Sequence, residues 1–393
     1  MKRSRRVLAT LMLVTFIATA CSDTDDGGGG GGGGTIVIGN VADFSDVYSY
    51  YDQPYLDGAQ FAVDEINAAG GILNRQVEIV FRDNENDLAL GARMAQEVLD
   101  EGIVYMIGTS SDAGVAQAQV VCAEGIPVST GYSSAPAIVA DMGECGFQTV
   151  YADNVGGAGI AEYARDQGYE TAYLLASPEI PYTANLPLYF GEAFEQGGGK
   201  VVGEGEFRID AGDYSAQVTE ISNLDPQPDV IFTSMFLPDT PVFLRQLRQA
   251  GVTTPVLGGD GNHDTALLDA GADVLDGFVF NTHGFPEPGT PFGEFFEKYT
   301  SETGNEPTSI VEGVGYDDIY FLKAAIEKAD STEPAAIIAA METVQIDGVT
   351  GTMKFDPETH RLVGQPVVLV RLDGAEMALE GTVTPQFVPD PDV

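Results

Sequence analysis

Short apolar segments alternate with amphipathic segments along most of the chain after residue 34. The apolar segments are rich in Val, Ile and aromatic residues, as strands buried on both faces are. We expect strands at 35–41, 76–83, 103–108, 126–130, 171–177, 201–207, 229–234, 254–259 and 277–283. We expect helices at 54–71, 88–102, 112–125, 185–199, 240–251, 292–303, 311–329 and 333–342. This alternation predicts an α/β fold built from parallel sheets that are covered by helices on both faces.

Two series of these units are separated by the segment 148–157. About 300 residues of alternating strands and helices ordinarily divide into two lobes, each with its own core. Two further strands, 351–356 and 365–374, follow the last helices, and we expect them to form a terminal hairpin added to one lobe. The pattern therefore predicts two doubly wound parallel-sheet lobes.

The N-terminal segment is typical of an export signal. Basic residues at 2–6 precede an apolar stretch at 7–20 that is too short to span a bilayer, so we predict a signal peptide over 1–20. The sequence Ala18-Thr19-Ala20-Cys21 fits an ordinary secretory cleavage site, and it also resembles a bacterial lipobox with Ala18 in place of the usual Leu. The flexible, glycine-rich segment that follows would suit a tether, so we expect Cys21 to be lipidated and 21–34 to be an anchor and tether.

Charge and cysteine content narrow the function classes. The chain has 60 acidic and 18 basic residues, a net charge of −42, which excludes a nucleic-acid partner because phosphate binding needs basic patches. The acidity indicates either a solvated surface or capture of cationic ligands. If a lipid occupies Cys21, Cys122 and Cys145 remain, and we expect them to form a disulfide in an oxidising compartment; two unpaired buried thiols are the alternative.

Candidate catalytic motifs are few. The segment 258–264, "GGDGNHD", contains a GNHD string that is typical of two-metal phosphatases, in which His263 would bind metal. Such a centre needs several His and Asp ligands, but the chain has three His and no D-x-H before the string. Phosphate-binding glycine loops and a G-x-S-x-G nucleophile motif are also lacking. We therefore predict no enzyme activity, no metal and no cofactor.

Hydroxyl side chains follow two of the expected strands. Ser110 and Ser111 lie in "GTSSDAG" at the start of a helix, and "STGYSSAP" at 129–136 follows the next strand. Hydroxyls and free N–H groups at a helix start can cap the helix, and they can also hold a carboxylate. Since ligands of open α/β sheets bind at the carboxyl ends of strands, two facing lobes would form a cleft there.

The chain resembles the type I periplasmic binding proteins of ABC importers, in particular the branched-chain amino-acid receptors. The resemblance covers roughly 35–375 and rests on "IVIGNVADFSD", on "YLDGAQFAVDEINAAGGILNR", on "GIPVSTGYSSAP" and on "DVIFTSMFLPDTPVFLRQLRQAG". It implies two lobes that are joined by three crossovers and close around a small ligand. On this basis we expect lobe 1 at 35–153 plus 282–350, lobe 2 at 154–281 plus 351–385, and a tail at 386–393.

The resemblance also implies a set of ligand-binding residues. By position in the family pattern these are Tyr51, Ser111, Ser133 or Ser134, Asp153, Tyr182, Phe236 and Asp260. In this pattern the serines hold the ligand carboxylate, the aromatic residues cover the ligand, and Asp260 holds the α-ammonium group. Two features depart from the pattern: Asp260 is one methylene shorter than the expected Glu, and Tyr132 replaces a small residue.

Together these observations predict a lipid-anchored, cell-envelope receptor that captures a small amino acid or related zwitterion or amide. It would deliver the ligand to the membrane permease and ATPase of an ABC importer. A ligand sensor of the same fold is the alternative, and a metallophosphatase is a remote one.

Overall fold

The computed structural model describes residues 34–110 and 113–391. The expected signal peptide, the lipidation site Cys21 and the expected ligand residue Ser111 lie outside these residues. Within them, no helix is long and apolar enough to cross a membrane.

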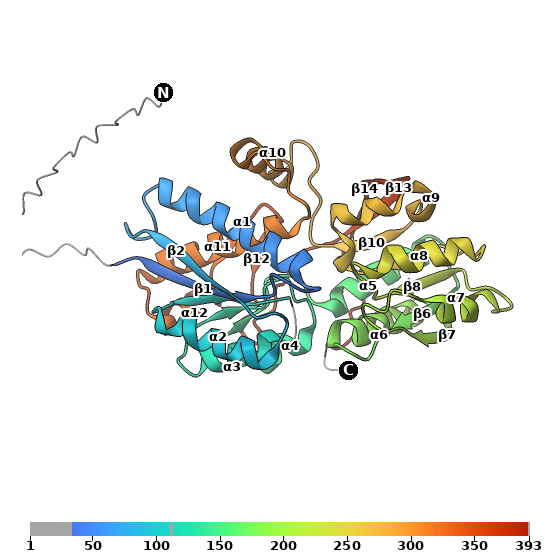
Figure 1. Ribbon diagram of the computed structural model, residues 1–393, viewed down its shortest axis with the longest axis horizontal. Coiled ribbons are helices and arrows are strands. Elements are labelled where there is room, and N and C mark those ends of the chain that lie inside the picture. Colours follow the sequence, from blue (N-terminus) through green and yellow to red (C-terminus); the bar gives the residue numbers. More distant parts are fainter. Residues whose placement is uncertain (1–33, 111–112, 392–393) are drawn as a thin grey trace, which may run out of the picture. The chain divides into compact units, whose positions relative to one another are not determined.

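The first lobe is built on a five-stranded parallel sheet of order β2-β1-β3-β4-β5. Its strands are β1 Ile36–Ala42, β2 Val77–Asp83, β3 Tyr105–Ile107, β4 Val128–Ser129 and β5 Gly146–Phe147. The helices of this lobe are α1 Ser49–Ala68, α2 Leu88–Asp100, α3 Ala113–Cys122, α4 Pro136–Met142, α10 Pro291–Thr303, α11 Val311–Ala329 and α12 Pro334–Met341. One face of the sheet is covered by α1 and α11 and the other by α2 and α3 (Figure 1).

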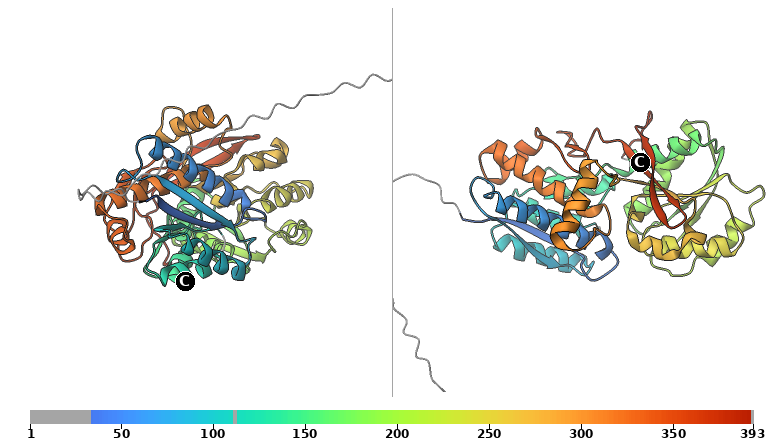
Figure 2. Two further views of the ribbon diagram at one scale, coloured as in Figure 1. Left: turned by 60° about the vertical axis from the view of Figure 1, so that its left-hand side comes forward. Right: turned by 90° about the horizontal axis from the view of Figure 1, so that it is seen from above.

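The second lobe is built on a seven-stranded sheet of order β14-β13-β10-β9-β8-β6-β7. Its strands are β6 Thr171–Ala176, β7 Lys200–Glu206, β8 Val230–Thr233, β9 Val256–Gly258, β10 Val279–Thr282, β13 Val367–Asp373 and β14 Glu376–Val383. Its helices are α5 Asp153–Asp166, α6 Pro181–Gln196, α7 Ser215–Ser222, α8 Asp239–Gln249 and α9 Ala272–Leu275, with 3₁₀ turns η1 Asp260–Asn262 and η2 Thr265–Ala270. The α/β class and the two lobes built on largely parallel sheets are as predicted. The right-hand view of Figure 2 shows the two lobes separately.

The C-terminal strands differ from the prediction. β12 (Thr352–Lys354) pairs with β11 (Gln345–Asp347) and not with β13, so the predicted hairpin of 351–356 with 365–374 is wrong. β13 instead pairs antiparallel with β10 and β14.

The chain passes between the lobes three times: before α5, after β10, and before β13. Phe355 and Leu362 still pack in the core of the first lobe, together with residues of α1 and α11. The third passage therefore follows Leu362, later than the expected boundary at 350.

Helix α10 shows how local sequence sets the ends of an element. The Thr290 hydroxyl accepts a hydrogen bond from Gly293 N at 3.1 Å, and Pro291 occupies the first turn, where no intrahelical N–H bond is lost. Phe295 and Tyr299, four residues apart, face the core. The helix ends at Gly304, whose φ of 79° is left-handed and favours glycine.

Cys122 and Cys145 form a disulfide with a Cα–Cα distance of 5.7 Å, as predicted. The bond links the end of α3 to the residue that precedes β5. It therefore fixes the outer helical layer of the first lobe to an edge of its sheet.

A buried carboxylate in the first lobe gives a testable pH dependence. Asp318 accepts hydrogen bonds from the Tyr105 hydroxyl at 2.6 Å and the Tyr55 hydroxyl at 3.0 Å, and burial raises its pKa from 3.8 to about 6. The folded state therefore holds a proton that the unfolded chain has released between these two pH values, so stability falls as pH rises from about 4 to about 6. We expect the free energy of unfolding of Asp318→Asn to fall less than that of the wild type over this range, by on the order of 2 kcal/mol, in urea titrations at pH 4 and pH 7. Equal falls would contradict the prediction.

Candidate functional site

A cavity lies between the two lobes at the carboxyl ends of their strands. Its lining residues are Tyr48, Tyr51, Ser110, Tyr132, Ser133 and Ser134 from the first lobe, and Ile180, Tyr182, Phe236, Asp260 and Gly261 from the second. The centre of a water-sized sphere can occupy about 50 Å³ of it, whereas one water needs only about 10–15 Å³ in this measure. The space therefore suits a small ligand, and no lining residue is Lys or Arg.

Aromatic rings form the apolar wall of the cavity and join the lobes. The ring of Phe236, which follows β8 in the second lobe, lies 6.2 Å from the rings of Tyr48 and Tyr51 of the first lobe and 6.1 Å from Tyr182. Tyr51 also stacks on Tyr132 at 5.9 Å. These rings supply a wall for an apolar ligand side chain.

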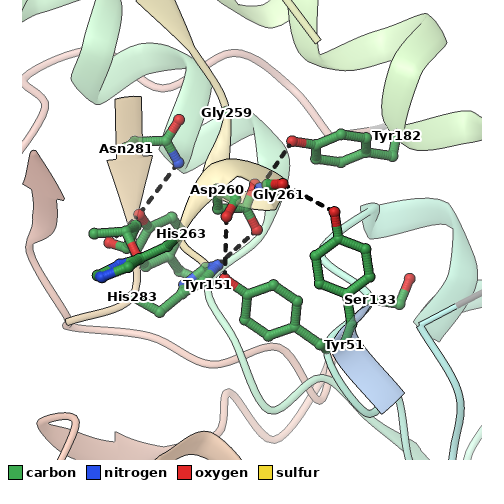
Figure 3. Close-up of polar contacts among 12 residues, drawn as sticks. Tyr51, Ser133, Tyr151, Tyr182, Gly259, Asp260, Gly261, His263, Asn281 and His283 are labelled. Atoms are coloured by element: carbon green, nitrogen blue, oxygen red, sulfur yellow. Dashed lines mark hydrogen bonds and ion pairs between the residues drawn. The ribbon is translucent and has the colours of Figure 1, made fainter. Parts of the chain in front are cut away.

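The backbone of Asp260 and Gly261 bonds three tyrosine hydroxyls, of which Figure 3 labels those of Tyr51 and Tyr182. The Tyr51 hydroxyl donates to Gly261 O at 2.9 Å, and the Tyr132 hydroxyl donates to Asp260 O at 3.4 Å. Gly261 N donates to the Tyr182 hydroxyl at 3.4 Å. Two of these bonds cross from one lobe to the other, so they fix the segment against the first lobe.

Two glycines flank Asp260 for a steric reason. A Cβ on Gly259 would lie 2.3 Å from the Tyr182 hydroxyl oxygen, and a Cβ on Gly261 would lie 2.7 Å from Cβ of Phe236. A side chain at either position would force the neighbouring aromatic residue to shift. The two glycines therefore allow the close packing of Tyr182 and Phe236 in the cavity wall.

Two acidic side chains and a histidine lie at the second-lobe side of the cavity. Asp260 lines the cavity, and its carboxylate contacts Nε2 of His283 at 3.0 Å (Figure 3). Asp153, the first residue of α5, is buried near Asp260 and does not line the cavity; burial and the negative charge of Asp260 raise its pKa well above 3.8. The cavity thus offers an acceptor for a cationic group.

Hydroxyl groups lie at the first-lobe side. Ser133 and Ser134 line the cavity directly after β4, and Ser110 lines it after β3. The N–H of Ser110 is not free, however, because it donates to Asp52 at 2.8 Å. Asp52, whose pKa burial raises to about 6, also accepts from the N–H of Asp43 at 2.8 Å. The expected anion-binding role of this loop therefore depends on hydroxyls and not on Ser110 N–H.

The structure brings most of the expected site residues together. The cavity contains Tyr51, Ser133, Ser134, Tyr182, Phe236 and Asp260. Sequence reasoning missed Tyr48, Ile180, Gly261 and His283. No local signal distinguishes them, because their proximity to the cavity arises from long-range packing.

The GNHD string has a structural role. His263 Nδ1 lies 2.7 Å from the Thr282 hydroxyl, and burial, followed by the nearby His283, lowers the pKa of His263 to about 3. Among the described residues, no group of three or more His, Cys, Asp or Glu could hold a metal ion.

Comparisons with known proteins place the chain in a family. A family model described as periplasmic binding protein matches residues 35–376. The Leu/Ile/Val-binding protein BraC3 of Rhizobium johnstonii is 26% identical over 305 residues, which cover 77% of this chain and 82% of that protein. The chain therefore belongs to the periplasmic binding proteins, whose members bind solutes and are not enzymes.

Two solved structures show the same fold. The leucine-binding protein LivK of Thermotoga maritima superposes with a TM-score of 0.79 at 25% identity, covering 89% of this chain and 99% of that one. A solute-binding protein of an ABC transporter from R. palustris, in complex with benzoate, superposes with a TM-score of 0.79 at 19% identity, covering 91% and 98%. The type I fold with the branched-chain amino-acid receptors as relatives is thus as the sequence had indicated.

Proposed function

We propose that this chain is the substrate-binding component of an ABC importer and captures a small amino acid of the branched-chain type, or a related zwitterion or amide. The observation that carries the proposal is the inter-lobe cavity, which combines the Asp260 carboxylate, the Ser133 and Ser134 hydroxyls and an aromatic wall. A carboxylate can accept from an ammonium group, hydroxyls can donate to a carboxylate, and the rings can cover an apolar side chain. The relative from Rhizobium johnstonii is named for Leu, Ile and Val.

Ligand capture would use hinge closure at the three passages between the lobes. The hydrogen bond from Tyr51 to Gly261 O crosses the cleft and would form only when the lobes are closed. The closed receptor would then dock on the permease and its ATPase. Family membership implies an exported protein, and we propose in addition that lipidation of Cys21 anchors it to the cell envelope. Mass spectrometry of the mature N-terminus tests the anchor, and an unmodified Cys21 would exclude it.

A ligand panel tests the binding function. Residues 35–393 are heated with each of the protein amino acids, their amides and a set of aromatic acids, and hits are measured by isothermal titration calorimetry. A ligand present at 100 times its Kd stabilises the folded state by about 2.7 kcal/mol, which is a clear shift in Tm. We expect Leu, Ile or Val among the hits. If no amino acid produces a shift, the amino-acid assignment is wrong.

Aromatic carboxylic acids are the second candidate ligands. The R. palustris structure contains benzoate, and four of the residues that line the present cavity are Tyr, with Phe236 as a fifth ring. A shift with benzoate and none with amino acids would favour this assignment.

A further inference from the structure

His283 occupies a position between the ligand cavity and the second passage between the lobes. It directly follows β10, and its Nε2 lies 3.0 Å from Oδ2 of Asp260. The side chains of His283 and Asp260 are only 2% and 4% exposed, so solvent screens this contact weakly. Because Asp260 also lines the cavity, the partner of His283 borders the space that a ligand would occupy.

Neighbouring rings hold the His283 side chain in place. The ring of Tyr151 lies 4.0 Å away, and the ring of Tyr132 meets it edge-on at 5.5 Å. Tyr132 is itself part of the cavity wall. The imidazole is thus buried between two rings, one of which borders the cavity.

The proton positions follow from the chemistry of the partner. An ionised carboxylate only accepts hydrogen bonds, so Nε2 of His283 carries the hydrogen that faces Asp260. Nδ1 of His283 is buried and has no hydrogen-bond partner among the described residues. A second proton would therefore bind at Nδ1 and give the imidazole a full positive charge.

Three titratable rings around His283 and Asp260 keep their charge state from pH 5 to 8. Burial raises the pKa values of Tyr132 and Tyr151 well above 10.0, and the pKa of His263 is lowered to about 3, so all three stay neutral. Two acids differ: burial and the charge of Asp260 raise the pKa of Asp153, and burial raises the pKa of Asp264, beside His263, to about 6. Histidine is the side chain that ordinarily changes charge in this pH range.

We propose that His283 is a specificity-determining residue that sets the charge of the cavity. When its imidazole is neutral, the Asp260 carboxylate holds a ligand ammonium group. When its imidazole is protonated, the charge of the Asp260 carboxylate is already neutralised. The inference rests on the proposed function in one respect, namely that the ligand carries an amine. The proton on Nδ1 and the ligand ammonium compete for the same negative charge. Since such coupling is reciprocal, ligand affinity falls as His283 becomes protonated, by at most about tenfold per pH unit.

The test is calorimetric titration of L-leucine into wild-type protein at pH 8.0 and at pH 5.5. We expect the Kd to rise at least about tenfold at the lower pH. In His283→Gln, whose amide still donates to Asp260 but cannot be protonated, the Kd should change less than about threefold. His360→Gln is the matched control: His360 stacks on Phe147 in the first lobe, outside the cavity, and this variant should keep the wild-type pH dependence. A wild-type pH dependence in His283→Gln, or none in the wild type, would overturn the inference.

A second measurement needs no ligand and separates this inference from the proposed function. The chain has three histidines, so their imidazole signals can be followed individually by NMR between pH 4 and 9. Asp260→Asn should move the titration of the His283 signal to lower pH and leave that of His360 unchanged. If L-leucine does not bind at any pH, the amino-acid assignment fails, and this titration alone decides on His283. An unchanged His283 titration would overturn the inference.

Discussion

Asp260→Ala should raise the Kd for an amine-bearing ligand at least about 100-fold while the protein remains folded. The Asp260 carboxylate is the one acidic group among the residues that line the cavity, and no Lys or Arg lies there to offset it. A ligand ammonium in the mutant cavity would be buried without a charged acceptor, which costs several kcal/mol. Calorimetric titration at pH 8, where histidine is ordinarily uncharged, measures the loss without leaving a charged His283 unpaired.

Two comparisons make the result specific. Asp273→Ala removes an exposed carboxylate from α9 of the same lobe, and it should bind the ligand like the wild type. Asp260→Asn keeps one acceptor oxygen in place, so its loss of affinity should be smaller than that of Asp260→Ala. Unfolding curves of all three variants show whether the fold is retained. Binding by Asp260→Ala within about threefold of the wild type would show that Asp260 does not hold the ligand.

The sheet strands in the centre of each lobe, and β13 near the C-terminus, could be predicted from the sequence, while β14 and the partner of β12 could not. Residues of β8 are all buried, and a continuous apolar run identifies such a strand. β14 is an edge strand with no fully buried residue, so no apolar run marks it. The pairing of β12 with β11 depends on long-range packing of the first lobe. The apolar pattern of 351–356 does not identify the strand with which this segment pairs.

Some residues of the candidate site could likewise be predicted from the sequence, and others could not. Ser133, Ser134 and Asp260 follow strands, where the fold rule places ligand residues, and six of the eight expected site residues line the cavity. His283 also follows a strand, but nothing in its neighbourhood in the sequence shows that it faces Asp260, 23 residues away. The sequence does not identify Gly261 as a site residue. Its role comes from its backbone atoms and from its lack of a side chain, and neither leaves a recognisable motif.

Gly58→Val should destabilise the first lobe by at least about 3 kcal/mol, because α1 and α11 touch through their backbones at this point. A Cβ on Gly58 would lie 1.8 Å from Glu312 O, and a Cβ on Gly315 would lie 2.1 Å from Tyr55 O. These clashes are with backbone carbonyl oxygens, which cannot turn aside as a side chain can. The helices would have to separate and open the core that lies between them.

The consequence reaches the ligand site, since α1 also carries Tyr51, whose hydroxyl bonds Gly261 O across the cleft. Gln60→Val is the matched control: it introduces the same side chain two residues further along α1, at an exposed position, and should cost less than about 1 kcal/mol. Urea unfolding followed by circular dichroism measures both. A loss below about 1 kcal/mol in Gly58→Val would show that α1 can shift without loss of packing, and Tyr51 would then be held by the cleft contacts and not by the close approach of the two helices.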